Sequence, residues 1–167
     1  MPQLVDKDAC ELLDADHVAV KHLFVEYARQ AMAGAAGTGV GSEAAAAVPD
    51  ERLALAQKIC AELTVHATIE EEIFYPALRG AIDEPELLDE AEAEHQEAKD
   101  LIAQIEALDT ADATMDDLVA ELARAIEHHV KEERDHLFPK ARASGLDLDA
   151  LSAQLKERQE ALEGQAA

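Results

Sequence analysis

The sequence predicts an all-α protein, an up-down-up-down four-helix bundle with a short C-terminal fifth helix. The composition is helix-forming, because Ala, Leu, Glu, Asp and Gln dominate over β-branched residues and aromatics are only 3% of the chain. Apolar residues also recur at alternating steps of four and three, as on a helix face that packs in a bundle. With 167 residues we expect one domain over 1–167, with the bundle over about 8–143 and the last helix over about 147–163.

The first predicted helix covers about 8–32, and a Gly- and Ala-rich stretch over 35–50 is expected to be a loop that ends in a Pro-Asp helix start. The second helix covers about 50–78, and Pro76 should kink or terminate it. The first inward seam steps by 4, 3, 4, 3, 4 through Leu13, His17, Val20, Phe24, Tyr27 and Ala31. The second has the same steps through Ile59, Leu63, His66, Glu70, Ile73 and Ala77.

The third and fourth helices, over about 84–108 and 114–143, repeat this arrangement. Thr114 and Asp117 are expected to form a capping box, and Asp147 to cap the fifth helix. The third seam contains Leu88, Ala91, His95, Ala98, Ile102 and Ile105. The fourth contains Val119, Leu122, Ile126, His129 and Glu133, followed by His136 or Leu137.

Helix lengths place the polar seam residues at one depth. His17 and His66 lie 17 and 16 residues from the connection between their helices, roughly 25 Å at 1.5 Å per residue. The same count matches His95 with His129 within about one turn. We therefore expect four imidazoles and two carboxylates in one layer of the core: His17, His66, Glu70, His95, His129 and Glu133.

Two segments of the chain predict a metal site in this layer. HATIEEEIFYP from His66 and HVKEERDHLFP from His129 both read His-x-x-x-Glu, which places an imidazole and a carboxylate on one helix face. These donors suit Fe, Zn, Mn or Ni rather than Ca or Mg. The alternative is a hydrogen-bonded polar layer, but each unpaired buried charge would cost about several kcal/mol, and two cations would compensate them.

The two halves of the chain also look like a repeat. DHVAVKHLF from Asp16 aligns with EHQEAKDLI from Glu94, so His17 corresponds to His95 and Lys21 to Lys99. Each half thus offers one lone histidine and one His-x-x-x-Glu clamp. This repetition indicates two metal ions related by an approximate two-fold axis.

The formal net charge of −23 excludes a nucleic-acid or anionic membrane surface as partner, since both would repel the protein. The sequence has no apolar run long enough for a membrane span and no basic segment followed by an apolar run at its start, so we expect a cytoplasmic protein. Cys10 and Cys60 are not spaced like a metal motif and are interpreted as reduced, buried or half-buried thiols.

Four motifs in order, DADHVAVKHLF, HATIEEEIFYP, EAEHQEAK and HHVKEERDHLFP, resemble the hemerythrin-like, or HHE cation-binding, family over about residues 10–143. The resemblance implies a four-helix bundle with a non-haem di-iron centre, in which two Fe ions share an oxo or hydroxo bridge. One histidine pair would hold each iron, with both carboxylates bridging. The implied metal ligands are His17 and His66 on one iron, His95 and His129 on the other, and Glu70 and Glu133 between them.

The sequence departs from the oxygen-carrying members at two positions. They have a histidine where this chain has Lys99, and a carboxylate where it has Arg134. Counting ligands leaves one open position on each iron rather than on one iron alone. The pattern is therefore closer to members that react with peroxide or nitric oxide, or that sense iron and oxygen, than to a reversible carrier.

Two classes of function remain open. One is a protein that binds dioxygen, peroxide or nitric oxide for sensing, scavenging or storage, and the other is a catalase-like enzyme that decomposes peroxide. The site also resembles that of iron–sulfur cluster repair proteins, although their Cys-bearing N-terminal region is missing. A ferritin-like, iron-handling oxidase is weaker, because Asp14-x-x-His17 and Glu92-x-x-His95 mimic its motif with acids that lie outside the seam.

Several other side chains near the layer are not assigned to the metals. Lys21 and Lys99 are interpreted as surface lysines rather than donors to the bridging carboxylates. The histidines and tyrosines for which no ligand role is predicted are His22, Tyr27, Tyr75, His128 and His136.

Overall fold

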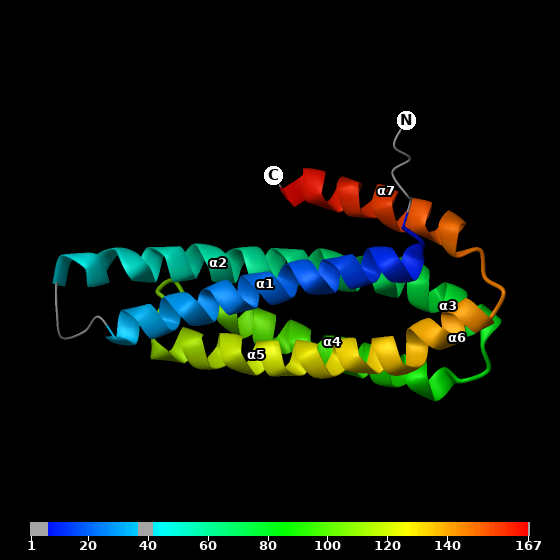
Figure 1. The fold of residues 1–167 in the computed structure, drawn as a ribbon, viewed down its shortest axis with the longest axis horizontal. Helices are drawn as coiled ribbons and strands as arrows, with labels where there is room; N and C mark the ends of the chain where they lie inside the picture. The colour runs from blue at the N-terminus through cyan, green and yellow to red at the C-terminus, as the bar shows by residue number, and fades with distance from the viewer. Residues whose placement is uncertain (1–6, 37–41, 167) are drawn as a thin grey trace.

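The computed structural model describes residues 7–36 and 42–166, and helices make up almost all of this part of the chain (Figure 1). The first half contains α1 (Ala9–Ala36), α2 (Ser42–Ile69), the π turn η2 (Glu70–Phe74) and α3 (Tyr75–Ala81). The second half contains α4 (Pro85–Glu106), α5 (Ala113–Glu132), the π turn η3 (Glu133–Leu137) and α6 (Phe138–Ala143). The last helix is α7 (Leu148–Ala166).

The predicted up-down-up-down bundle is confirmed. Successive long helices run in opposite directions, and α1 packs against α2 and α5 while α4 packs against the same two helices (Figure 1). The predicted fifth helix, α7, lies across the outside of α1 and α2 (Figure 1). Leu151 and Leu155 of α7 are buried, so this helix contributes side chains to the hydrophobic core.

The loop expected over 35–50 is wrong over much of its length. α1 extends to Ala36 and α2 begins at Ser42, so the Pro-Asp pair lies inside α2 rather than at its start. The intervening sequence contains four consecutive alanines, Ala44 to Ala47, and alanine has the highest helix propensity. Residues 37–41 of the expected loop lie outside the described residues.

The break expected at Pro76 takes the form of a π turn ahead of the proline. Tyr75, the residue before Pro76, donates its backbone N–H to the carbonyl of Glu70, five residues earlier. Phe138, the residue before Pro139, donates in the same way to the carbonyl of Glu133. Proline has no N–H and its ring collides with the carbonyl four residues before it. A widened turn accommodates both effects, so each helix continues beyond its proline.

Each π turn shifts the buried seam by one residue. Up to Glu70 and Glu133, the described members of the predicted seams are buried or half-buried. Beyond Glu70, the fully buried positions are Phe74, Tyr75 and Leu78 rather than the predicted Ile73 and Ala77, which are half-buried. The extra residue of the turn is the reason, since it rotates everything that follows.

The start of α5 also differs from the prediction. Asp112, with an extended backbone, caps the helix by accepting the N–H of Met115 at 3.1 Å, whereas a capping box was expected at Thr114. The predicted cap at Asp147 is confirmed, because its Oδ1 accepts the N–H of Ala150 at 3.0 Å.

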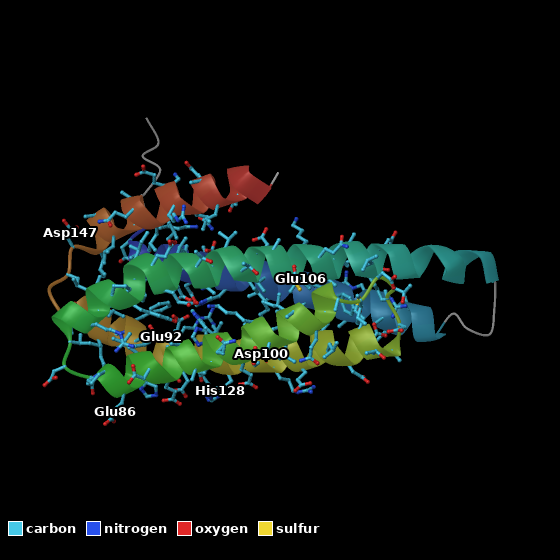
Figure 2. All side chains as sticks on the ribbon, turned by 180° about the vertical axis from the view of Figure 1, so that it is seen from behind. Glu86, Glu92, Asp100, Glu106, His128 and Asp147 are labelled. Carbon is cyan, nitrogen blue, oxygen red and sulfur yellow. The ribbon has the colours of Figure 1, made fainter. Side chains whose placement is uncertain are left out.

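Two apolar clusters fill the bundle, and they leave a polar layer between them. One, with Cys10, Leu78 and Leu155, lies around α3, α6 and α7, and the other, with Cys60 and Met115, lies toward the connection of α4 and α5. Both cysteines are buried free thiols, as predicted. Acidic side chains cover the outer faces, as the labelled positions of α4 illustrate (Figure 2).

Within the described residues, none of the helices is both long and apolar enough to cross a bilayer. At the end of the bundle far from α7, Asp116 ties three helices together. Its carboxylate accepts the Tyr27 hydroxyl at 2.7 Å and the Arg52 guanidinium at 2.7 and 2.8 Å, and Arg52 also donates to the carbonyl of Ala111. This network holds α1, α2 and α5 together at that end of the bundle.

Candidate metal centre

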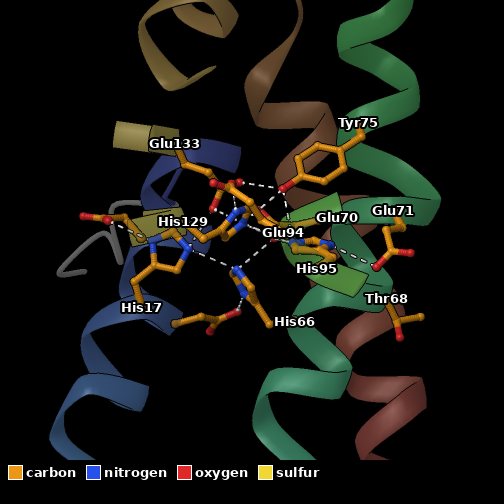
Figure 3. Close-up of polar contacts among 12 residues, drawn as sticks. His17, His66, Thr68, Glu70, Glu71, Tyr75, Glu94, His95, His129 and Glu133 are labelled. Carbon is orange, nitrogen blue, oxygen red and sulfur yellow. Dashed lines mark hydrogen bonds and ion pairs between the residues drawn. The ribbon is translucent and has the colours of Figure 1, made fainter. Parts of the chain in front are cut away.

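The structure brings all six predicted site residues together in the layer between the two apolar clusters (Figure 3). α1, α2, α4 and α5 each supply one histidine, and the two glutamates are the first residues of the two π turns. None of the six is more than 7% exposed. Their role as metal ligands stays a prediction. The six residues are His17, His66, Glu70, His95, His129 and Glu133.

The histidines form two pairs. Nε2 of His17 lies 3.1 Å from Nε2 of His66, and Nε2 of His95 lies 3.1 Å from Nε2 of His129. This is the pairing that the helix lengths predict. The ring centroids are 4.8 and 4.6 Å apart and the ring planes make angles of 64° and 59°, so the rings of each pair are steeply tilted rather than stacked.

Both carboxylates lie between the pairs. Oε1 of Glu70 is 3.2 Å from Nε2 of His66 and 3.1 Å from Nε2 of His95. Oε1 of Glu133 is 3.1 Å from Nε2 of His17 and 3.3 Å from Nε2 of His129. Each glutamate therefore contacts one histidine from each pair, which is the arrangement that a bridging carboxylate requires.

The outer nitrogen of every histidine in the layer meets a carboxylate. The Nδ1 atoms of His17, His66, His95 and His129 lie 3.2, 3.1, 2.9 and 2.8 Å from oxygens of Asp14, Asp16, Glu71 and Glu94 respectively. A carboxylate at Nδ1 places the ring proton there and leaves the Nε2 lone pair facing inward. Sequence reasoning missed these partners, and only Asp14, three residues before His17 on the same helix, has a spacing that could have indicated its contact.

The donor set fits metal ions. Two inward Nε2 lone pairs at 3.1 Å repel each other unless a cation lies between them. Oε2 of Glu70 and Oε1 of Glu133 are buried and accept no hydrogen bond from the residues that the structure describes. The inner atoms form two groups whose members lie within 4.8 Å of one another, close to the roughly 4 Å between opposite ligands of an ion bound at about 2.1 Å. Glu70 belongs to both groups.

Without metal, protons take the place of the cations. Burial alone would lower the pKa of His66, but the Glu70 and Asp16 carboxylates outweigh it and raise this pKa to about 10. Burial would likewise lower the pKa of His129, but the Glu133 carboxylate outweighs this effect and raises the pKa well above its ordinary value. Burial would raise the pKa of Glu70, yet His66 holds it well below its usual range. Each clamp thus carries one proton that a metal ion would displace.

Tyr75 enters the layer, although the sequence predicted no ligand role for it. Its buried hydroxyl donates to Oε2 of Glu133 at 3.0 Å and lies 3.3 Å from Nε2 of both His95 and His129. Burial and the adjacent Glu133 raise the pKa of Tyr75 well above 10, so the phenol is neutral. The corresponding residue of the other half is Phe138, whose ring stacks on His17 at 6.0 Å.

The other side chains outside the layer are where the sequence placed them. Lys99 is 45% exposed and donates to Glu71 at 2.7 Å, not to a bridging carboxylate. Lys21 and His22 are exposed, and His128 and His136 are 62% and 52% exposed. Asp14 and Glu92 do not join the inner groups, since Asp14 contacts His17 from outside and Glu92 pairs with Arg79. This arrangement does not match the ferritin-like alternative.

A cavity of about 120 Å³ reaches the histidine layer from the side of the second apolar cluster. All four histidines of the layer line it, and the rest of its wall is mostly apolar, with Leu63 and Ile102 among the lining residues. Thr68 and Lys99 also line it. A single water needs only about 10–15 Å³ measured in this way, so the cavity has room for a small molecule against the histidines.

The fold and the site define a helical-bundle protein with a buried histidine and carboxylate centre suited to metal cations. The chain matches the hemerythrin HHE cation binding domain over residues 8–141 and belongs to this family, as its motifs predicted. HHE domains bind metal cations.

A solved structure gives the same fold. A hemerythrin HHE cation binding domain-containing protein from Mycobacterium kansasii superposes with a TM-score of 0.72, at 24% identity, over 96% of this chain and 90% of that one. Among curated proteins, a DNA nickase of Nostoc sp. is 38% identical over 84 residues. That match covers 48% of this chain and only 23% of the nickase, so nicking is a property of the much longer relative.

Proposed function

We propose that the chain holds two iron ions and that these bind or react with dioxygen, peroxide or nitric oxide. The cavity against all four histidines carries this proposal, because it gives a small molecule a place beside the metal positions. Its mostly apolar wall favours small neutral molecules over ions, which would lose their hydration there. Bound iron would supply electrons by cycling between Fe(II) and Fe(III).

The residues of the layer divide the remaining work. His17 and His66 would hold one ion, and His95 and His129 the other, each through Nε2. Glu70 and Glu133 would hold both ions and keep them close, since each already contacts one histidine of each pair. The carboxylates at Nδ1 would fix the rings and increase their basicity.

A specific observation favours peroxide decomposition as a second candidate. The neutral Tyr75 hydroxyl lies 3.3 Å from the two nitrogens of one pair and 3.0 Å from Glu133. It can therefore donate a hydrogen bond to Glu133 or to a peroxide held at that pair and so orient the peroxide, as an enzyme would require. Among the described residues, no comparable donor faces the other pair, because Phe138 stands there.

The test has two stages. Anaerobic loading with Fe(II), followed by elemental analysis, should give about two irons per chain, and a value of one or none would remove the di-iron proposal. Stopped-flow mixing with dioxygen, hydrogen peroxide and nitric oxide then compares the three reactants. A stable adduct indicates binding, whereas continued release of dioxygen from hydrogen peroxide indicates the enzyme. No spectral change with any reactant would contradict both.

A matched control tests whether the cavity is the route. Ala98→Phe places a ring in the cavity one turn from His95, at a position that is 6% exposed. We expect two irons to remain and the bimolecular rate with dioxygen to fall by about tenfold or more, since access is blocked. Ala93→Phe, on the exposed face of α4, should leave the rate unchanged.

A further inference from the structure

The C-terminal helix α7 reaches the histidine layer through one side chain, Gln159. Its amide nitrogen donates to both oxygens of Asp16, at 3.3 and 3.2 Å. Asp16 in turn accepts from Nδ1 of His66 at 3.1 Å. Nε2 of the same ring faces His17 and Glu70. A chain of three contacts therefore connects a surface helix to one predicted metal position.

This support is absent from the other half of the described structure. Glu94 holds Nδ1 of His129 at 2.8 Å, as Asp16 holds that of His66. Glu94 has a second ion-pair partner, His128, at 3.0 Å. His128 is 62% exposed and lies on α5, the helix that also carries His129, so no additional helix supports Glu94 as α7 supports Asp16. α7 packs against α1, α2 and η2, on the side of the His17–His66 pair (Figure 1). The approximate two-fold repeat is thus broken by this helix.

The helix is held in place independently of Gln159. Leu151 and Leu155 are buried in the apolar cluster, and Ser152 donates its hydroxyl to the carbonyl of Lys7 at 2.5 Å. Arg158 pairs with Glu72 at 3.0 Å. Gln159 can therefore be changed without removing the contacts that dock α7.

We propose that Gln159 is a positioning residue for His66, and that docking of α7 is coupled to the metal ion held by the His17–His66 pair. This inference rests on the proposed metal centre. The two amide contacts orient Asp16, and Asp16 fixes the ring of His66, so losing Gln159 lets both side chains move away from the metal position. By linkage, an ion that holds His66 in place also stabilises docked α7.

The first measurement uses Zn²⁺, which binds the same kinds of ligand and does not change oxidation state. Stepwise competition with a chelator gives the affinity of each ion in the parent and in Gln159→Leu. We expect one of the two ions to bind about tenfold more weakly in the variant, at the lower end of the 10–100-fold effect of outer partners. Gln159→Lys, which restores a donor to Asp16, should recover the affinity. Gln154→Leu, on the exposed face of α7, should match the parent.

Hydrogen exchange measures the coupling from the other direction. Zn²⁺ should slow hydrogen exchange of the α7 amides in the parent. In Gln159→Leu, Zn²⁺ should no longer slow this exchange. The ¹⁵N shift of the His66 ring, recorded without metal, should change in Gln159→Leu while that of His129 does not. This last readout decides the positioning role even if the centre fails to bind Zn²⁺, and a failure to react with dioxygen leaves all three readouts intact.

Either of two results would overturn the proposal. One is an unchanged His66 ring signal together with unchanged affinity for both ions. The other is equal weakening of both ions, which would mean that Gln159 acts through the fold as a whole rather than through His66.

Discussion

The His17–His66 pair and the His95–His129 pair have the same inner geometry, with 3.1 Å between the two Nε2 atoms in each. Both pairs share Glu70 and Glu133, and every ring has a carboxylate at Nδ1. Their surroundings differ. Phe138 faces the first pair and Tyr75 the second, and α7 supports only the first. A repeated sequence motif has therefore produced two histidine pairs with equivalent inner geometry and different neighbours.

The largest expected effect comes from removing what the two pairs share. Glu70→Ala or Glu133→Ala should each weaken both ions by at least about 100-fold, because even changes to outer partners cost 10–100-fold. Titration with Fe(II) under anaerobic conditions measures this, and Glu97→Ala, on the exposed face of α4, is the control. A variant that lost only one ion would show that its carboxylate belongs to one pair and does not bridge.

A pH titration tests whether the two clamps are protonated without metal. The pKa of His66 is raised to about 10, and that of His129 is also raised. A raised pKa stabilises the fold fully below the unfolded value of about 6.5, and the stabilisation is lost as pH rises toward 10. Urea unfolding of the metal-free protein should therefore show a loss on the order of a few kcal/mol between pH 7 and 10. The Zn²⁺-loaded protein, whose histidines are already neutral, should not show this loss.

Tyr75→Phe makes the second pair resemble the first. The variant loses a buried hydrogen bond to the Glu133 carboxylate, which should lower the metal-free free energy of unfolding by about 2 kcal/mol. Denaturant titration gives this value. If Tyr75 also orients peroxide through its hydroxyl, peroxide turnover of the iron-loaded variant should fall while both irons remain bound. Unchanged stability with unchanged turnover would show that the hydroxyl does not distinguish the two pairs.

The smallest effects should come from the exposed cations that contact the outer carboxylates. Lys99 pairs with Glu71 beside His95, and Arg134 pairs with Asp14 beside His17. These pairs are half exposed, so Lys99→Met and Arg134→Met should each lower the free energy of unfolding by less than about 1 kcal/mol. In competition with a chelator, each substitution should change the affinity for the nearer ion by less than about tenfold. A larger change at the farther ion would contradict the assignment of outer partners to separate pairs.

Periodicity predicted four bundle helices and the six residues of the layer, but not where α2 begins. Seam steps of four and three specify an inward face. The predicted pairing of His17 with His66 is right, although the count of residues behind it began α2 at Asp50 rather than at Ser42. This reasoning holds only while the helix keeps 3.6 residues per turn. It therefore failed beyond Glu70, where the π turn places Phe74 and Leu78 inward instead of Ile73 and Ala77.

The tertiary structure decided which side chains surround that layer. Asp16 holds His66 from a different helix, and Glu71 holds His95 in the same way, so neither pairing leaves a spacing along one helix that could be read. Tyr75 is brought inward by the extra residue of the π turn, and Gln159 meets Asp16 across 143 residues of sequence. Repetition within the chain predicts equivalent ligands, because each repeat forms the same local helix. The neighbours of those ligands depend on how whole helices pack, which no local pattern encodes.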